Sequence, residues 1–224
     1  MSLSVASDPF AILLLALTID LAFGDMAVVF RYLPHPIVIA GRAIGFFDQR
    51  LNREGRSDAA RRVRGAITVI VLAGTAAALG WAIGQYLRVV HYAWLIEALL
   101  VAVLLAQRSL FEHVAAVGTA LQAEGLQGGR TAVAKIVGRD PDSLDEYGVA
   151  RAAIESLFEN FSDGVIAPAF WYLLLGLPGL FAYKTANTLD SMIGHRSPNI
   201  FVSAGRRHGS TMPSIGFRRG SRLC

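Results

Sequence analysis

Apolar residues gather in four long runs along the chain, and each run is close to the length that a membrane span requires. The runs cover residues 5–24, 65–87, 89–107 and 165–183. A transmembrane helix needs roughly 20 mostly apolar residues. The second run carries no charge and the third carries one, Glu97. This pattern predicts an all-α, polytopic membrane protein with three or four hydrophobic segments. The first run lacks a basic leading region and a cleavage pattern, so we expect an uncleaved span.

The fourth run leaves two arrangements open. Pro168, Gly176, Pro178 and Gly179 interrupt it. As one span, it would place its polar flanks on opposite sides of the membrane. As two half-helices broken at residues 176–179, it would enter and leave on the same side, which membranes tolerate where protein covers the freed backbone.

Basic residues near the span ends predict the orientation, because cytoplasmic loops are enriched in them. Residues 31–64 carry eight arginines against three acids, and the loop after the third run begins with Arg108. The excess of arginine over lysine is typical of GC-rich bacterial genes. We therefore expect a multi-pass protein of a bacterial inner (plasma) membrane, with residues 31–64 and 108–163 facing the cytoplasm.

Composition supports this interpretation. The chain is 54% hydrophobic and only 17% charged, whereas a soluble domain has about 25% charged residues. The alternative is a soluble helical bundle, which would have to bury the long uncharged run. The single cysteine, Cys224, excludes an intrachain disulfide. The net charge of +4 comes from residues 196–224, which have six arginines and no acid, and such a tail without a patterned helix predicts no nucleic-acid partner.

The cytoplasmic loop, residues 108–163, has the pattern of amphipathic helices. We expect one helix from Arg108 to about Glu124, ending in the glycine-rich residues 125–129, and a short helix over 130–137. A third helix should begin at a capping box formed by Ser143 and Glu146. It should run to about residue 160 and end at residues 162–164.

Chemistry-capable groups lie on this last helix and at the membrane edges. Glu155 and Glu159 share a helix face, and their like charges would be stabilised by a cation or a cationic partner; a solvated acidic face is the alternative. Asp163 is either functional or an interfacial cap. Ionisable groups at a bilayer are expensive and are functional candidates by default, although Glu97 could equally make a helix-packing hydrogen bond. No nucleotide-binding glycine loop, zinc-protease motif or nucleophile elbow is found.

Several stretches together resemble one known family. They are LTIDLAFGD, RYLPHPIVIAGRAIG, RRVRGA, AQRSLFEHV, KIVGRDPDSLDEYGVARAAIESLFENFSDGVIAPAFW and YKTANTLDSMIGHR. The chain resembles adenosylcobinamide-phosphate synthases, the CobD/CbiB family of cobalamin biosynthesis, from about Leu17 to Arg196. The resemblance implies a membrane ligase that consumes ATP and joins adenosylcobyric acid to aminopropanol or its phosphate through an amide. The corrinoid, the amino-alcohol and the lipid membrane are the implied partners.

This activity assigns roles to the polar groups. ATP and Mg²⁺ are implied because a carboxylate must be activated before an amine attacks it. The metal candidates are Glu155, Glu159, Asp163 and Asp190. The predicted catalytic residues are these four with Asn187 and His113, the last as proton acceptor from the amine. The predicted substrate-binding residues are Arg108, Arg139, Arg151, Asn160 and Lys184.

The chain departs from the family after Ser197. Relatives continue with a Tyr-x-Arg-Phe-Gly-Trp-Ala-Ala-Ala-Arg-Leu-Asp-Asp type of stretch and a further hydrophobic region. Residues 199–212 can be encoded by nucleotides that, read two positions later, give that stretch. We therefore predict a frameshifted, truncated C-terminus. Residues 1–198 would form the membrane-embedded synthase domain, and residues 199–224 an aberrant, disordered basic tail. This puts the activity of the chain as it stands in question.

Two other functions remain open. Glu97 within a span and the broken fourth run are compatible with a small membrane transporter or channel subunit. A membrane scaffold that recruits partners through residues 108–163 is the second alternative. A transporter would concentrate polar groups at the midplane of the membrane, whereas here most of them lie at its edge.

Overall fold

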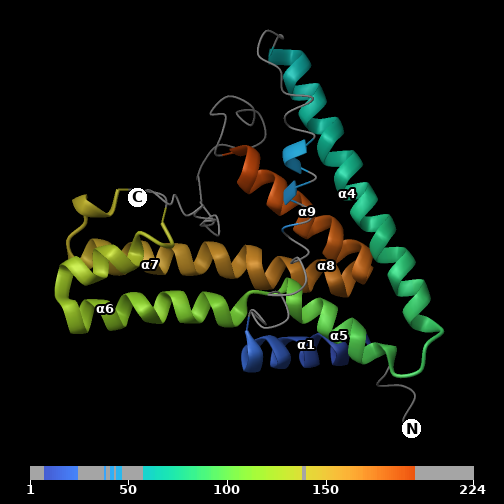
Figure 1. Cartoon of the computed structure of the whole chain (residues 1–224), viewed down its shortest axis with the longest axis horizontal. Helices are drawn as coiled ribbons and strands as arrows, with labels where there is room; N and C mark the ends of the chain where they lie inside the picture. Colours follow the sequence, from blue (N-terminus) through green and yellow to red (C-terminus); the bar gives the residue numbers. More distant parts are fainter. Residues whose placement is uncertain are drawn as a thin grey trace, which may run out of the picture. The chain divides into compact units, whose positions relative to one another are not determined.

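The computed structural model describes residues 8–24, 38, 41–42, 44–46, 58–137 and 140–194 (Figure 1). Within these residues every regular element is helical, which confirms the predicted all-α class. The contacts divide the chain into two compact units. Unit 1 contains the described residues up to Leu110 and those from Asn160 onward, and unit 2 contains those of Phe111–Glu159. Arg139, the predicted boundary at residue 198 and the predicted aberrant tail lie outside the described residues.

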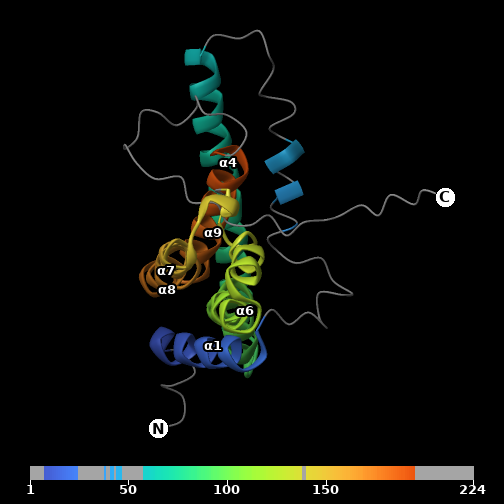
Figure 2. The same ribbon diagram turned by 90° about the vertical axis from the view of Figure 1, so that its left-hand side faces the viewer.

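Unit 1 contains most of the apolar helices. They are α1 (Pro9–Phe23), α4 (Asp58–Arg88), α5 (Ala93–Leu104), the π-helix η3 (Ser162–Ile166), α8 (Ala167–Leu175) and α9 (Leu177–Gly194). Helix α4 lies along α9, as both views show, and α1 packs on α5 and α8 (Figures 1 and 2).

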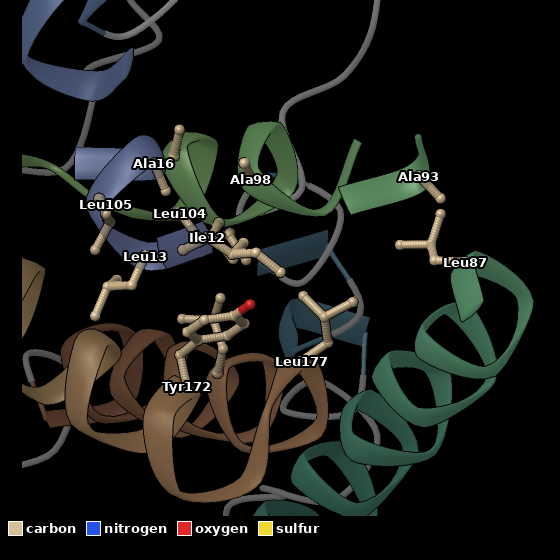
Figure 3. Close-up of a cluster of buried hydrophobic side chains, with 13 residues drawn as sticks. Ile12, Leu13, Ala16, Leu87, Ala93, Ala98, Leu104, Leu105, Tyr172 and Leu177 are labelled. Carbon is tan, nitrogen blue, oxygen red and sulfur yellow. The ribbon is translucent and has the colours of Figure 1, made fainter. Parts of the chain in front are cut away.

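The core of unit 1 lies where α1, α5, α8 and α9 meet (Figure 3). Ile12 and Leu13 of α1 and Leu177 of α9 surround the ring of Tyr172, which is 1% exposed. Small residues of α5, such as Ala98, are also completely buried and let the helices approach closely. Burial of this apolar surface is the main favourable term that holds unit 1 together.

A glycine separates α8 from α9, where the sequence predicts the break. Gly176 has a φ of +69°, a conformation that residues with a Cβ rarely adopt. Its N–H donates to the carbonyl of Tyr172 at 2.7 Å and closes the last turn of α8. Helix α8 has nine residues, which span only about 14 Å. The fourth run is therefore not one continuous helix, and the half-helix arrangement in a membrane stays a prediction.

A second glycine allows α4 to cross the start of α9. A Cβ at Gly80 would lie 2.7 Å from the carbonyl oxygen of Leu177, so only glycine permits this approach. By contrast, a Cβ at Gly84, four residues further along α4, would meet nothing within 4 Å. The backbones of α4 and α9 are thus in direct contact where Gly80 meets Leu177.

Two stretches, Val63–Arg88 and Ala93–Val133, are long and apolar enough to cross a membrane. The first confirms the predicted helix over residues 65–87 and is only 17% buried in its most apolar window. The second is interrupted, because α5 ends at Leu104 and Leu105 is extended. Helix α1 has 15 residues, beginning after Asp8, whose side chain caps it, and α5 has 12. Both helices are shorter than the spans predicted over 5–24 and 89–107. The all-helical fold and the two long apolar stretches are nevertheless consistent with a membrane protein.

Unit 2 is built from two helices that lie side by side. They are α6 (Gln107–Val133), which begins at the end of unit 1, and α7 (Glu146–Phe161), with the short 3₁₀ helix η2 (Pro141–Ser143) between them. Their core is apolar and includes Val117, Val133 and Val149. The predicted interruption of α6 is confirmed at Gly125, where φ is +65°, but the helix resumes directly afterwards instead of at residue 130.

The predicted capping residue of α7 and the predicted stop at residues 162–164 are wrong, whereas the predicted α-helical end near residue 160 is confirmed at Phe161. The capping residue is Asp145, whose Oδ1 accepts the N–H of Gly148 at 2.7 Å. Ser143 instead donates its hydroxyl to the carbonyl of Asp140 within the 3₁₀ turn. The helix also does not stop at residues 162–164, because its backbone stays helical through the π-helix into α8.

Candidate functional site

Asp20 near the end of α1 caps the first turn of α6. Its carboxylate is 1% exposed, and Oδ2 accepts the backbone N–H of Gln107 at 2.7 Å and that of Arg108 at 3.4 Å. The first N–H groups of a helix have no partner within the helix, and a negative charge there also complements the helix dipole. Asp20, which the sequence places among the membrane-edge polar groups, therefore has a structural role.

Arg108 makes the reciprocal contact with the end of α1. Its Nη1 donates to the carbonyls of Leu21 and Ala22, at 3.0 Å each. Gly24, with a φ of +64°, makes room for the arginine, since a Cβ there would lie 3.2 Å from the Arg108 side chain. Each helix end is thus satisfied by a side chain from the other helix. The predicted role of Arg108 in substrate binding stays a prediction.

The π-helix brings Asp163 to the same part of unit 1. Asp163 is partly buried, and a Cβ on the neighbouring Gly164 would lie 3.3 Å from Ala106, directly before α6. Burial and the negative charge of Asp190 raise the pKa of Asp163, while Lys184 and a hydrogen bond from Tyr183 act in the opposite direction. Single π-turns within α-helices are frequent at functional sites.

Lys184 lies on α9 directly after the apolar run and is 7% exposed. Burial lowers its pKa to about 8, and the negative charges of Asp163 and Asp20 oppose this shift. A buried lysine is costly unless nearby charges compensate it. Unit 1 therefore combines one buried cation with two carboxylates that come from different helices.

Glu97 in the third run has a partner in the core. The hydroxyl of Tyr172 donates to Oε1 of Glu97 at 2.9 Å and joins α8 to α5. This confirms that Glu97 takes part in a helix-packing hydrogen bond. This contact gives Glu97 a packing role, so Glu97 no longer favours the transporter hypothesis, which keeps the broken fourth run as its other support.

The remaining predicted site residues divide between the two units. Glu155 and Glu159 lie on α7 in unit 2 and are exposed, as are Arg151 and His113. In unit 1, Asn160 precedes the π-helix, and Asn187 and Asp190 follow Lys184 on α9. Asn160 and Asn187 are partly buried, and Asp190 is exposed. In the part of the chain that the structure describes, no three His, Cys, Asp or Glu side chains form a group that could hold a metal ion. The proposed ligands supply one carboxylate pair in each unit, so the four-residue metal site stays a prediction.

Sequence reasoning missed Tyr183, which directly precedes Lys184. Its hydroxyl donates to the backbone carbonyl of Asp163 at 3.3 Å. The available signal was Pro168, five residues after Asp163, because proline lacks the N–H that a preceding carbonyl would otherwise accept.

Comparison with known proteins identifies the family of this chain. The sequence profile described as "CobD/Cbib protein" matches residues 13–203. The chain belongs to the CobD/CbiB family. A family member from Sinorhizobium sp., named cobalamin biosynthesis protein CobD, is 56% identical over 188 residues. Proteins of the same name from Rhizobium meliloti and Rhodobacter capsulatus are 49% identical over 195 residues and 44% identical over 187 residues.

These alignments cover 84%, 87% and 84% of this chain, but 58%, 60% and 59% of the respective relatives. The chain thus spans somewhat less than two thirds of the length of these CobD/CbiB proteins. No solved structure matches the chain.

Proposed function

We propose that this chain acts in cobalamin biosynthesis, as a membrane ligase that joins adenosylcobyric acid to aminopropanol or its phosphate. The product would be adenosylcobinamide or its phosphate. Membership of the CobD/CbiB family and the names of the relatives support the pathway. The amide-forming step goes beyond what these names state and is proposed in addition.

The observation that carries the proposal is the meeting of four separate motif stretches in unit 1. Asp20, Arg108, Asp163 and Lys184 come from four stretches that carry the family resemblance. A hydrogen bond, the close approach of Gly164 to the side chain of Ala106, and electrostatic interactions connect them. Buried charge of this kind is expensive to maintain, so its concentration at one place favours a binding or catalytic role.

Lys184 is the group best suited to an anionic substrate. With a pKa of about 8 it is protonated in most molecules at neutral pH, and burial strengthens its attraction to a phosphate or carboxylate. Asp163 beside it would orient the ammonium or accept a hydrogen bond from substrate. His113, exposed on α6, is proposed to accept the proton that the amine releases as the amide forms.

The carboxylates of the chain fit a magnesium ion that arrives with a nucleotide. Mg²⁺ is usually held by one or two carboxylates together with substrate phosphates. Asp163 and Asp190, whose charges interact, would supply such a pair in unit 1, and Glu155 and Glu159 would supply one in unit 2. Bound Mg-ATP would supply the phosphoryl group that turns the carboxylate into an electrophile.

A multi-pass position in a bacterial inner membrane is also proposed, with the site facing the cytoplasm. The two long apolar stretches and the arginine-rich segment 31–64 support it. Exposed apolar side chains along α4, such as Ile70 at 71% and Trp81 at 60% exposed, suit contact with lipid tails.

The direct test is an assay of membranes from cells that express the gene after repair of the proposed frameshift. Adenosylcobyric acid, aminopropanol phosphate and Mg-ATP are added, and the amide product is detected by mass spectrometry. We expect product only when ATP is present, and strongly reduced product in Lys184→Met. Lys135→Met is the matched control, because Lys135 is the only other lysine and is exposed in unit 2.

Absence of ATP-dependent amide from membranes that contain the folded, repaired protein would contradict the ligase proposal. Product formation by the present 224-residue chain would contradict the view that residues beyond 198 are needed.

A further inference from the structure

The π-turn that carries Asp163 has a clear cause in the sequence. The N–H of Ala167 donates to the carbonyl of Ser162, five residues earlier, instead of to that of Asp163. The next residue, Pro168, has no N–H. The carbonyl of Asp163 therefore receives neither the N–H of Ala167, its α-helical donor, nor an N–H from Pro168, its π-helical donor.

The Tyr183 hydroxyl takes the place of this missing donor. It reaches the backbone carbonyl of Asp163 from α9, with the two oxygen atoms 3.3 Å apart. Pro168 is completely buried and Gly164 is buried, so water has poor access to this side of the turn. Asp163 itself is partly buried, and a partly buried carbonyl without a donor is costly, which makes the tyrosine contact more valuable than a fully exposed one.

We infer that Tyr183 is a positioning residue, whose hydroxyl replaces the donor removed by Pro168 and holds the Asp163 turn against α9. Tyr183 and Lys184 are consecutive, so the contact that fixes Asp163 also fixes its distance from the buried ammonium. The inference rests on the proposed function only in treating Asp163 as a site residue.

Hydrogen–deuterium exchange of the purified chain tests the contact without reference to activity. In Tyr183→Phe, amides 162–167 should exchange about tenfold faster, which corresponds to about 1.4 kcal/mol for a partly buried carbonyl that loses its donor. Tyr172→Phe is the matched control. It also removes a hydroxyl that donates to an oxygen within unit 1, but it should leave exchange at 162–167 unchanged.

A double-mutant cycle with Pro168→Ala gives the sharper test. The alanine restores an N–H that can donate to the carbonyls of the turn. Tyr183→Phe should therefore accelerate exchange less than about twofold in the Pro168→Ala background. If the two effects simply add, or if Tyr183→Phe alone leaves the turn unchanged, the inference is wrong. If Tyr183→Phe fails to fold, recovery of the fold by Pro168→Ala supports the inference, and no recovery overturns it.

In the repaired enzyme, Tyr183→Phe should lower kcat about tenfold with little change in KM for the corrinoid, whereas Tyr172→Phe should not produce this split. An inactive repaired enzyme would contradict the proposed function, and the exchange experiment alone would then decide the role of Tyr183. Altered exchange with unchanged kcat would mean that the turn is held by Tyr183 without positioning a catalytic group, which overturns the inference.

Discussion

The two lysines of this chain lie in different units and in opposite environments. Lys184 in unit 1 is 7% exposed, between the charges of Asp163 and Asp20, whereas Lys135 in unit 2 is exposed. Asp20 of unit 1 is also buried, whereas Glu155 and Glu159 of unit 2 are exposed. Unit 1 therefore depends on close contacts and compensated charges, and unit 2 on an ordinary apolar core with a solvated surface. Substitutions at equivalent features of the two units should have unequal effects.

The largest difference is expected for glycines. Gly80→Leu should lower the free energy of unfolding by about 3 kcal/mol, because its side chain would meet the backbone of Leu177. Gly84→Ala in α4 and Gly118→Ala in unit 2, where a Cβ meets nothing, should instead stabilise by about 0.5–1 kcal/mol. Chemical denaturation in detergent measures all three, and similar values would show that α4 and α9 are not in close contact.

Helix caps should show the next largest difference. Asp20→Ala should cost about 2 kcal/mol, because it leaves partly buried N–H groups of α6 without their acceptor. Asp145→Ala removes the exposed cap of α7 and should cost about 1 kcal/mol or less. Asp20→Asn, which keeps an acceptor oxygen, should recover part of the loss, and an equal cost for the two alanine variants would remove the distinction between buried and exposed caps.

The lysines should differ in pH dependence. The pKa of Lys184 is lowered from 10.5 to about 8 in the folded chain, so between these values the unfolded chain binds more protons. Stability attributable to this group should therefore rise with pH across that window, by about 1 kcal/mol per pH unit. Lys184→Met should abolish the rise in stability, and Lys135→Met should keep it. Midpoints of chemical unfolding at about pH 7.5, 8.5 and 9.5 measure the difference. Retention of the rise in Lys184→Met would assign it to another group.

The smallest change in stability is expected at the acidic face of α7. Glu155→Ala and Glu159→Ala should each change stability by about 0.5 kcal/mol or less, since both side chains are exposed. If they assist magnesium binding as proposed, amide formation by the repaired enzyme should nevertheless fall at least about tenfold. Unchanged product formation in both variants would remove them from the site and leave only a solvated surface.

Local sequence features predict much of the fold. The uncharged run over 65–87 corresponds to α4, and the break at residues 176–179 is found at Gly176. Helix α7 ends at Phe161, close to the predicted residue 160. The predicted stop at residues 162–164 is wrong, because Ser162 and Gly164 are typical of helix ends, whereas the chain here passes through a π-turn before Pro168. The predicted site residues are found in both units, and electrostatic interactions in unit 1 connect Asp163, Lys184 and Asp190.

The sequence by itself determined most of the helical segments and the breaks at Gly125 and Gly176, because hydropathy and glycine conformation are properties of neighbouring residues. Only the tertiary structure decided that Asp20 caps a helix beginning at Gln107 and that Tyr183 serves the carbonyl of Asp163. These partners are far apart in sequence, and a hydrogen bond at such separation depends on how helices pack, which no local pattern specifies.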